Sequence, residues 1–412
     1  MYAAQIDWKA RLKAMGPGLL MASAAVGGSH LVASTQAGAL YGWQLAVVIV
    51  LVNLLKYPFF RFSVNYTVSS GKSLVEGYSE RSRAYVWVFM LLSIPSATIS
   101  TGAVALLSAV ILKNVLPVDI SVPVLTVGLM IATLVIVLGG HFKLLDKVTK
   151  WIMISLTLST VIAVAIAAGK GSHMQPEFIE TSPWTWASLS FIVALMGWMP
   201  APMEVSAANS MWILAKQREG KNSLKDALFD FDVGYGVSLV LALIFLALGA
   251  LVQYGNGQEL KLQGGAYIGQ LISMYAEVMG DWTRLLVAFI AFACMFGTLL
   301  TVADLYGRLL AEAQRLLTKS EYSRKTMAFW TVWSVASGLV LILWFKSALG
   351  EMLRFAMISA FLTAPVYAWL NYSLVRRSGI KINGVMRVLA ALGLVYLVGF
   401  ALIFVAQQLG WL

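Results

Sequence analysis

The stretch Gly27-Gly28-Ser29-His30 interrupts a long apolar segment, Met15 to Leu40, near its centre. A second interruption, Gly197-Trp198-Met199-Pro200-Ala201-Pro202-Met203-Glu204, lies close to the middle of the chain. Glycine weakens a helix and proline cannot continue one, so each stretch predicts a broken helix. A membrane tolerates such a break only where the freed backbone is buried in protein or lines a cavity. Secondary transporters carry these breaks in pairs and build the substrate site from them, so the chain is predicted to be a transporter.

The composition is that of a polytopic membrane protein. Of the 412 residues, 59% are hydrophobic and only 12% are charged, against about 25% charged residues in a soluble domain. The segment before Lys13 is basic and leads directly into the first span, so we expect no cleavable signal peptide. Apolar segments long enough to cross a bilayer are expected at residues 15–40, 44–66, 85–112, 120–140, 148–168, 185–214, 231–254, 283–312, 327–346, 350–375 and 384–410.

We attribute the net charge of +11 to the expected membrane topology and not to a nucleic-acid partner. The eleven expected spans place 24 of the 30 Lys and Arg residues on one side of the membrane. By the positive-inside rule that side is the cytoplasm, so the N-terminus is expected inside and the C-terminus outside, in a bacterial inner membrane. The six basic residues on the other side are Lys113, Lys170, Lys261, Arg284, Lys346 and Arg354.

We expect one transmembrane domain over residues 1–412, without a separate soluble domain or an obligate protein partner. Its predicted parts are a first repeat of five helices at 1–168, a second at 185–375, and an appended helix at 384–410. An odd number of spans per half inverts the second half relative to the first. The prediction is therefore an all-α membrane fold of two inverted five-helix repeats plus an eleventh helix, in which helices 1 and 6 are discontinuous.

The first break offers groups for either sign of ion. Gly27 and Gly28 would free the N–H groups of a following half-helix, whose positive dipole end favours an anion. The carbonyl groups that end the preceding half-helix favour a cation instead. Ser29 and His30 add a hydroxyl and an imidazole. The alternative, a glycine-rich helix contact, is common in membranes but does not require a histidine.

In the second break, Ala201, Pro202 and Met203 are predicted to line the same site, with a simple proline kink as the alternative. Glu204 begins the following half-helix. It is either a ligand or a structural cap that complements the helix dipole, and the sequence favours neither. Ser206 and Asn209 are further candidates to face the cavity.

The eighth span carries Thr298, Thr301 and Asp304 at a spacing that places them on roughly one helical face. Hydroxyls beside a carboxylate suit a hard ion such as sodium, so these three residues are the predicted coupling-ion site. An ion pair between Asp304 and Arg308, one turn further on, is the alternative.

Outside the predicted sites, three charged residues receive structural interpretations. Lys56 is expected to reach the cytoplasmic interface with its long side chain. Asp230 and Asp232 are expected to begin the seventh span as N-terminal acids.

Enzymatic chemistry finds no support in the sequence. The three histidines, His30, His141 and His173, lie in separate segments, and no nucleophile–base pair or phosphate loop is visible. The single cysteine, Cys294, excludes an intrachain disulfide and a thiolate metal cluster, and we interpret it as a core residue. No cofactor is expected, apart from sodium as a possible coupling ion.

With these motifs the chain resembles the Nramp family of divalent-metal transporters. Gly16-Pro17-Gly18 opens the first span, and Gln36-Ala37-Gly38 followed by Tyr41-Gly42 closes it. Ser70-Gly71-Lys72-Ser73-Leu74 is similar to the family's loop after the second span. The resemblance extends over most of the chain and implies a LeuT-type fold in which spans one and six carry the site.

The chain departs from the family at the metal site. The family's Asp-Pro-Gly-Asn motif aligns with Gly27 to His30, and its Met-Pro-His motif aligns with Ala201, Pro202 and Met203. The carboxylate and the thioether, which select transition metals, are therefore replaced by Gly27 and Ala201. The third span also lacks the acids that the family uses for proton movement, since no Asp or Glu occurs between Arg83 and Asp119.

Three functional hypotheses follow. The first is a secondary transporter of a small oxyanion, with bicarbonate the most natural size, coupled to sodium. The second is a divalent-cation transporter, for magnesium or, less favoured, for manganese bound by His30 and Glu204. The third is a receptor-like membrane protein that does not transport.

Overall fold

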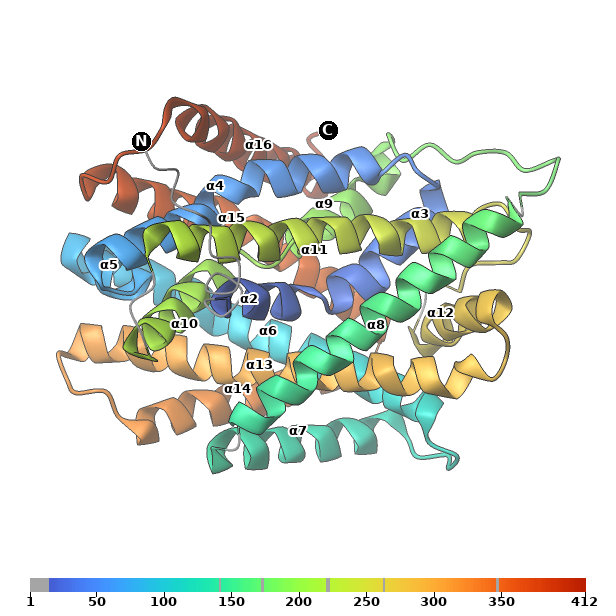
Figure 1. Ribbon diagram of the computed structural model, residues 1–412, viewed down its shortest axis with the longest axis horizontal. Coiled ribbons are helices and arrows are strands. Elements are labelled where there is room, and N and C mark those ends of the chain that lie inside the picture. Colours follow the sequence, from blue (N-terminus) through green and yellow to red (C-terminus); the bar gives the residue numbers. More distant parts are fainter. Residues whose placement is uncertain (1–14, 141, 172–173, 220–222, 262–263, 346–347) are drawn as a thin grey trace, which may run out of the picture.

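The computed structural model describes residues 15–140, 142–171, 174–219, 223–261, 264–345 and 348–412; for a few of these, among them 142–150, it describes the backbone only. Within this part of the chain the regular structure is helical. Most helices run nearly parallel to the long axis of the molecule, and α8 crosses the bundle obliquely (Figure 1). Among the described residues, eight helices are long and apolar enough to span a membrane by length and composition.

The first half of the chain follows the expected spans closely. Its helices are α2 (Pro17–Ala25), η1 (Ser29–Ser34), α3 (Thr35–Tyr41), α4 (Ala46–Ser70), α5 (Leu74–Arg81), α6 (Arg83–Val115), α7 (Val122–Gly139) and α8 (Phe142–Lys170). The short helix α5 was not expected. It begins at a capping box, in which Ser73 and Glu76 each accept a hydrogen bond from the other's backbone N–H.

The second half repeats the pattern of a broken helix followed by long ones. It contains η2 (Trp186–Ser188), α9 (Leu189–Gly197), α10 (Val205–Glu219), α11 (Leu224–Val252), α12 (Gly264–Met279), α13 (Thr283–Thr318), α14 (Arg324–Trp344), α15 (Leu349–Arg377) and α16 (Gly384–Gln408). Helix α12 was not expected either. The predicted discontinuities of spans one and six are confirmed, because α2 is separated from η1 and α9 from α10.

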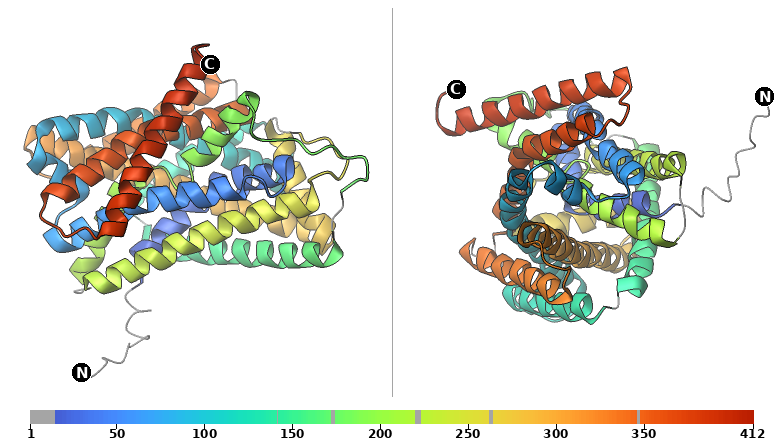
Figure 2. Two further views of the ribbon diagram at one scale, coloured as in Figure 1. Left: turned by 90° about the horizontal axis from the view of Figure 1, so that it is seen from above. Right: turned by 90° about the vertical axis from the view of Figure 1, so that its left-hand side faces the viewer.

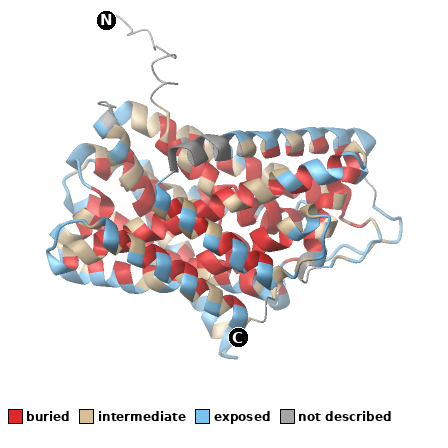
Figure 3. Cartoon of the chain, turned by 90° about the horizontal axis from the view of Figure 1, so that it is seen from below, coloured by how far each residue is buried: buried red, intermediate tan, exposed pale blue. Residues whose placement is uncertain are grey.

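The broken helices lie inside the bundle. Buried residues concentrate between the helices, whereas exposed ones cover the outside (Figure 3). At the periphery, α7 exposes Ile131 and Val135, and α16 exposes Val395 and Leu402; α16 lies along the outer edge of the bundle (Figure 2). These apolar faces suit contact with lipid, so the outer helices separate the broken ones from the bilayer.

Glycine pairs seat both halves of the first broken helix against α11. A Cβ atom on Gly18 would lie 2.1 Å from the carbonyl oxygen of Asp230, and one on Gly234 would lie 2.2 Å from that of Gly18. Helix α3 approaches α11 in the same way, because a Cβ atom on Gly38 would lie 2.0 Å from the carbonyl oxygen of Leu246. Only glycine permits this approach, so α11 holds α2 and α3 on either side of the break.

Candidate functional site: a pocket between two broken helices

The first break leaves a short run of backbone outside any helix. Helix α2 ends where Val26 donates to the Ala22 oxygen, and helical bonding resumes where Leu31 donates to the Gly27 oxygen at 3.0 Å. The first N–H groups of a helix have no partner within it. Among the bonds of the described residues, none involves the N–H of Gly28 or Ser29. These two groups are therefore available at the break.

Both glycines of the break face side chains from other elements. A Cβ atom on Gly28 would lie 2.9 Å from the Trp198 ring, which belongs to the second break. One on Gly27 would lie 3.3 Å from Thr298 of α13. The absence of side chains at these positions thus brings the two breaks and α13 together.

His30 is directed away from this meeting point. Its Nε2 lies 2.9 Å from the carbonyl oxygen of Ser238 in α11, and its Nδ1 lies 2.8 Å from the Ser29 hydroxyl. A carbonyl oxygen only accepts hydrogen bonds, so Nε2 carries a proton. The imidazole is fully buried and ties η1 to α11.

The second break runs from Trp198 to Glu204, and a lysine occupies the end of its first half-helix. The ammonium group of Lys56 donates to the oxygens of Met196 at 2.7 Å and Gly197 at 3.1 Å. The expectation that Lys56 reaches the cytoplasmic interface is wrong. It lies near the middle of α4 and is fully buried, because the last carbonyl groups of α9 need a donor at that depth.

Glu204 is buried at the other end of the same break. Its Oε1 accepts a hydrogen bond of 2.8 Å from the Tyr306 hydroxyl of α13, whereas its Oε2 has no hydrogen-bond partner among the described residues. Tyr306 also approaches the Ser100 hydroxyl of α6 at 3.4 Å. The carboxylate is therefore held beside the breaks by a tyrosine that itself faces the cavity.

A pocket of about 50 Å³ lies where the two breaks, α6 and α13 meet. This volume accommodates a few water-sized groups. Seven of the predicted site residues line it: Gly27, Gly28, Ser29, Ala201, Pro202, Thr298 and Thr301. The lining also includes residues that the sequence analysis did not select, among them Ser100, Trp198 and Tyr306.

The polar groups of the pocket divide into two kinds. The hydroxyls of Thr298 and Thr301 donate to the oxygens of Cys294 and Gly297, each at 3.0 Å. Having used their hydrogens, they offer only lone pairs to the pocket. The indole Nε1 of Trp198 is buried and has no partner among the described residues. It is a pure donor. We call the hydroxyls of Thr298 and Thr301 the hydroxyl wall, and the unpaired N–H groups of Gly28, Ser29 and Trp198 the N–H wall.

Four predicted site residues do not line the pocket: His30, Met203, Glu204 and Asp304. Met203 is fully buried. Asp304 accepts a hydrogen bond of 2.7 Å from Arg308 Nε, so its carboxylate is engaged in the intrahelical ion pair that the sequence offered as an alternative. Among the described residues, no group of three or more His, Cys, Asp or Glu is placed to hold a metal ion. His141 and His173 lie outside the described residues.

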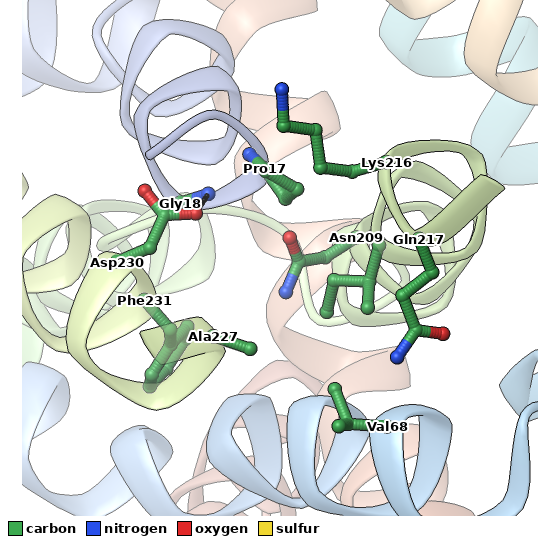
Figure 4. Close-up of a pocket in the computed structure, with 10 residues that line it drawn as sticks. Pro17, Gly18, Val68, Asn209, Lys216, Gln217, Ala227, Asp230 and Phe231 are labelled. Carbon is green, nitrogen blue, oxygen red and sulfur yellow. Dashed lines mark hydrogen bonds between the residues drawn. The ribbon is translucent and has the colours of Figure 1, made fainter. Parts of the chain in front are cut away.

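A second, smaller pocket lies between α2, α10 and α11 (Figure 4). Asp230 lies at its edge and accepts hydrogen bonds from the N–H groups of Gly16, at 3.1 Å, and Gly18, at 2.7 Å. Asn209 points into it and is almost fully buried, with neither amide atom bonded among the described residues. The amide of Asn209 therefore lies off the central pocket, on its α2–α10 side.

The expectation that Asp230 and Asp232 begin the seventh span is also wrong. Helix α11 begins earlier, at Leu224, after Ser223 accepts a hydrogen bond from the N–H of Asp226. Asp230 instead caps the start of α2. Asp232 accepts a hydrogen bond of 2.6 Å from the Tyr57 hydroxyl and pairs with Arg61 at 3.5 Å.

Two broken helices that line one pocket within a membrane bundle are typical of secondary transporters. The chain belongs to the Nramp family, since the family model for natural resistance-associated macrophage protein-like sequences matches residues 18–407. An uncharacterized protein of Pasteurella multocida (strain Pm70) is 50% identical over 409 residues, which cover 98% of this chain and 94% of the relative.

Solved structures share the fold at low sequence identity. A crystal structure of a mutant of the Eremococcus coleocola manganese transporter superposes with a TM-score of 0.74 at 14% identity, covering 99% of this chain and 89% of that one. The nucleobase–cation symporter MHP1 in a closed conformation superposes with a TM-score of 0.61 at 16% identity, covering 96% and 93%. The expected LeuT-type, all-α membrane fold is thereby confirmed.

Proposed function

We propose that the chain transports a small oxyanion, of the size of bicarbonate, by alternating access, and that sodium drives the transport. One observation carries the proposal. The described lining of the central pocket contains neither a carboxylate nor a thioether or imidazole, but pairs a free N–H wall with a hydroxyl wall. Carboxylate and thioether groups are those that would select a divalent transition metal.

The N–H wall suits the anion. The Trp198 indole and the N–H groups of Gly28 and Ser29 lie at the start of η1, where the helix dipole also favours negative charge. Donors that are already in place and buried bind an oxyanion without reorganising. The substrate site that we propose therefore consists of Gly27, Gly28, Ser29, Trp198, Ala201 and Pro202.

The hydroxyl wall suits the coupling ion. Thr298 and Thr301 present lone pairs within reach of the first break, since Gly27 faces Thr298. Uncharged oxygens of this kind are ligands for a hard monovalent cation. A sodium ion on this wall would partly neutralise an anion on the N–H wall, so the two would bind more tightly together than apart.

The pocket is more accessible toward the α2–α10 side. The lining residues Ala24, Pro202, Thr301 and Val302 are half-buried, whereas Gly28, Val104 and Thr298 are buried. The charge bias of the sequence assigns this side to the cytoplasm. We therefore interpret the conformation as one that leads from the site toward the cytoplasm.

Divalent-cation transport is the second candidate, for magnesium before manganese. The structural likeness to a manganese transporter favours it, and so does the unpartnered oxygen of Glu204. A hydrated magnesium ion needs few direct protein ligands, and Glu204 would then supply negative charge from behind Tyr306. Manganese would require His30 and Glu204 to turn into the pocket.

Uptake into liposomes containing the purified protein separates the candidates. We expect bicarbonate entry, followed with a pH-sensitive dye in the lumen, to depend on external sodium and to be unaffected by manganese or magnesium. Protein-free liposomes provide the control for passive carbon dioxide entry. Uptake of either metal without bicarbonate uptake would instead establish the second candidate, and bicarbonate entry that persists without sodium would remove the coupling.

A further inference from the structure

Two buried ionisable side chains, one basic and one acidic, lie at the ends of the second break and do not line the pocket: Lys56 of α4 and Glu204. Lys56 and Glu204 are 0% and 1% exposed, respectively. No direct ion pair joins them among the described residues. Lys56 bonds the carbonyl groups at the start of the break, and Glu204 stands at its end, where it bonds Tyr306. A buried charge is costly unless another charge or a hydrogen-bond network compensates it.

Lys56 is placed where a broken-helix transporter often binds a cation. The carbonyl groups at the end of a half-helix carry partial negative charge and coordinate coupling ions in such folds. Here the Lys56 ammonium donates to two of these carbonyl groups, those of Met196 and Gly197. The Lys56 side chain therefore occupies the position at the end of α9 where a coupling cation would bind in such folds.

Glu204 supplies the matching negative charge. Tyr306 fixes one carboxylate oxygen and lines the pocket, so the carboxylate is one hydrogen bond from the cavity wall. Asp304 and Arg308, the nearest further charges on α13, neutralise each other. Lys56 and Glu204 are thus the ionisable groups that the structure places at the two ends of the second break.

We propose that Lys56 and Glu204 form a compensating charge pair that decides which sign of ion the central pocket accepts, with Lys56 the residue that admits an anion. Without Lys56, the Glu204 carboxylate would repel an oxyanion and attract a cation. Without Glu204, the Lys56 charge would favour the oxyanion further. The part of this inference that concerns bicarbonate rests on the proposed function, whereas the pairing of the two charges does not.

The test compares single and double neutralisation. Lys56→Gln keeps a hydrogen-bond donor for the α9 carbonyl groups but removes the charge. We expect it to raise the KM for bicarbonate at least about tenfold, the change produced by ~1.4 kcal/mol, and to tighten manganese or magnesium binding by a similar factor. Glu204→Gln is expected to act in the opposite direction, and the double variant to lie near the wild type in both measurements.

The matched control is Lys113→Gln, which changes the net charge equally. Lys113 lies in the last turn of α6 and is exposed. Its ammonium group pairs at 3.0 Å with the carboxylate of Asp119, which follows the helix. Metal binding is measured by isothermal titration calorimetry on protein that remains monodisperse in detergent. A Lys56→Gln variant that matches Lys113→Gln in both KM and metal affinity would overturn the pairing.

Two further outcomes remain decisive. If Lys56→Gln does not fold, Glu204→Gln and the double variant still test the pair, and the absence of an opposite shift in Glu204→Gln overturns it. If the wild-type protein carries no bicarbonate, the proposed function fails, but metal titration of the variants continues to report on the charge pair. The two failures are therefore distinguishable.

Discussion

Single side chains in the proposed site are expected to have separable tasks, and Trp198 is the clearest case. Its indole N–H is buried and has no partner among the described residues. Trp198→Phe keeps most of the ring that packs on Gly28 and removes this one donor. A hydrogen bond to a charged group contributes about 1.5–3 kcal/mol, so we expect the KM for the oxyanion to rise at least about tenfold. Liposome uptake measures this, with the exposed Trp344→Phe as the control; an unchanged KM would remove Trp198 from the site.

Thr298 is expected to affect the coupling ion instead. Thr298→Val preserves shape but removes the hydroxyl oxygen that faces Gly27. We expect the sodium concentration for half-maximal uptake to increase several-fold, with a smaller change in the KM for the oxyanion at saturating sodium. Thr318→Val, at the exposed end of the same helix, is the control. If the KM for the oxyanion changes and the sodium dependence does not, the two walls have been assigned the wrong way round.

The sequence predicted which residues break the helices but not which residues stabilise the broken ends. Glycine and proline act through their own backbones, so Gly27, Gly28 and Pro202 are visible locally. Lys56 and Asp230 act across 140 and 212 residues, respectively, on the ends of other helices. A hydropathy profile shows that each is a charged residue within or near an apolar segment, but it does not predict which distant helix end the side chain contacts. Trp198 and Tyr306 were missed for a related reason, since an aromatic residue in a membrane helix usually packs against lipid or core.

The contact between α2 and α11 depends on glycine at the level of whole elements. In Gly234→Ala the added methyl group would lie 2.2 Å from the Gly18 oxygen. Overpacking of this kind costs about 1–3 kcal/mol, so we expect a lower melting temperature in detergent. Gly236→Ala lies on the same helix, where an added Cβ atom meets nothing within 4 Å. It is expected to leave the melting temperature unchanged or to raise it, because alanine favours the helix. Equal melting temperatures for the two variants would contradict the close packing.

The helices divide into those that form the site and those that shield it, and the sequence distinguishes the two groups poorly. All eleven predicted spans appear as helices or helix pairs, because hydropathy reports length and composition. Burial depends instead on which faces other helices cover. The most apolar segment of α6 is 78% buried, whereas that of α16 is only 22% buried. Yet α16 has the higher mean hydropathy, 2.7 against 1.7. Helix α12 is amphipathic, so a search for continuous apolar runs overlooks it.

The orientation of the whole molecule in the membrane is a prediction from its distribution of charge. The chain has one cysteine, Cys294, which is buried in α13 and therefore a poor target for a labelling reagent. Glu259 and Glu321 are exposed at opposite ends of the bundle, beyond α11 and α13 respectively. Each therefore accepts a single cysteine substitution that reports which side of the membrane it occupies.

With the N-terminus in the cytoplasm, Glu259→Cys would lie outside and Glu321→Cys inside. We expect a membrane-impermeant maleimide to label Glu259→Cys in intact cells, and to label Glu321→Cys only after permeabilisation. The wild-type protein, with Cys294 alone, is the control for background labelling. Once the buried Lys56 is set aside, the positive-inside argument rests on 23 of the remaining 29 basic residues being expected on one side, so the reverse pattern would contradict it. It would also place the more accessible side of the pocket outside the cell, and so reverse the direction in which this conformation presents its site.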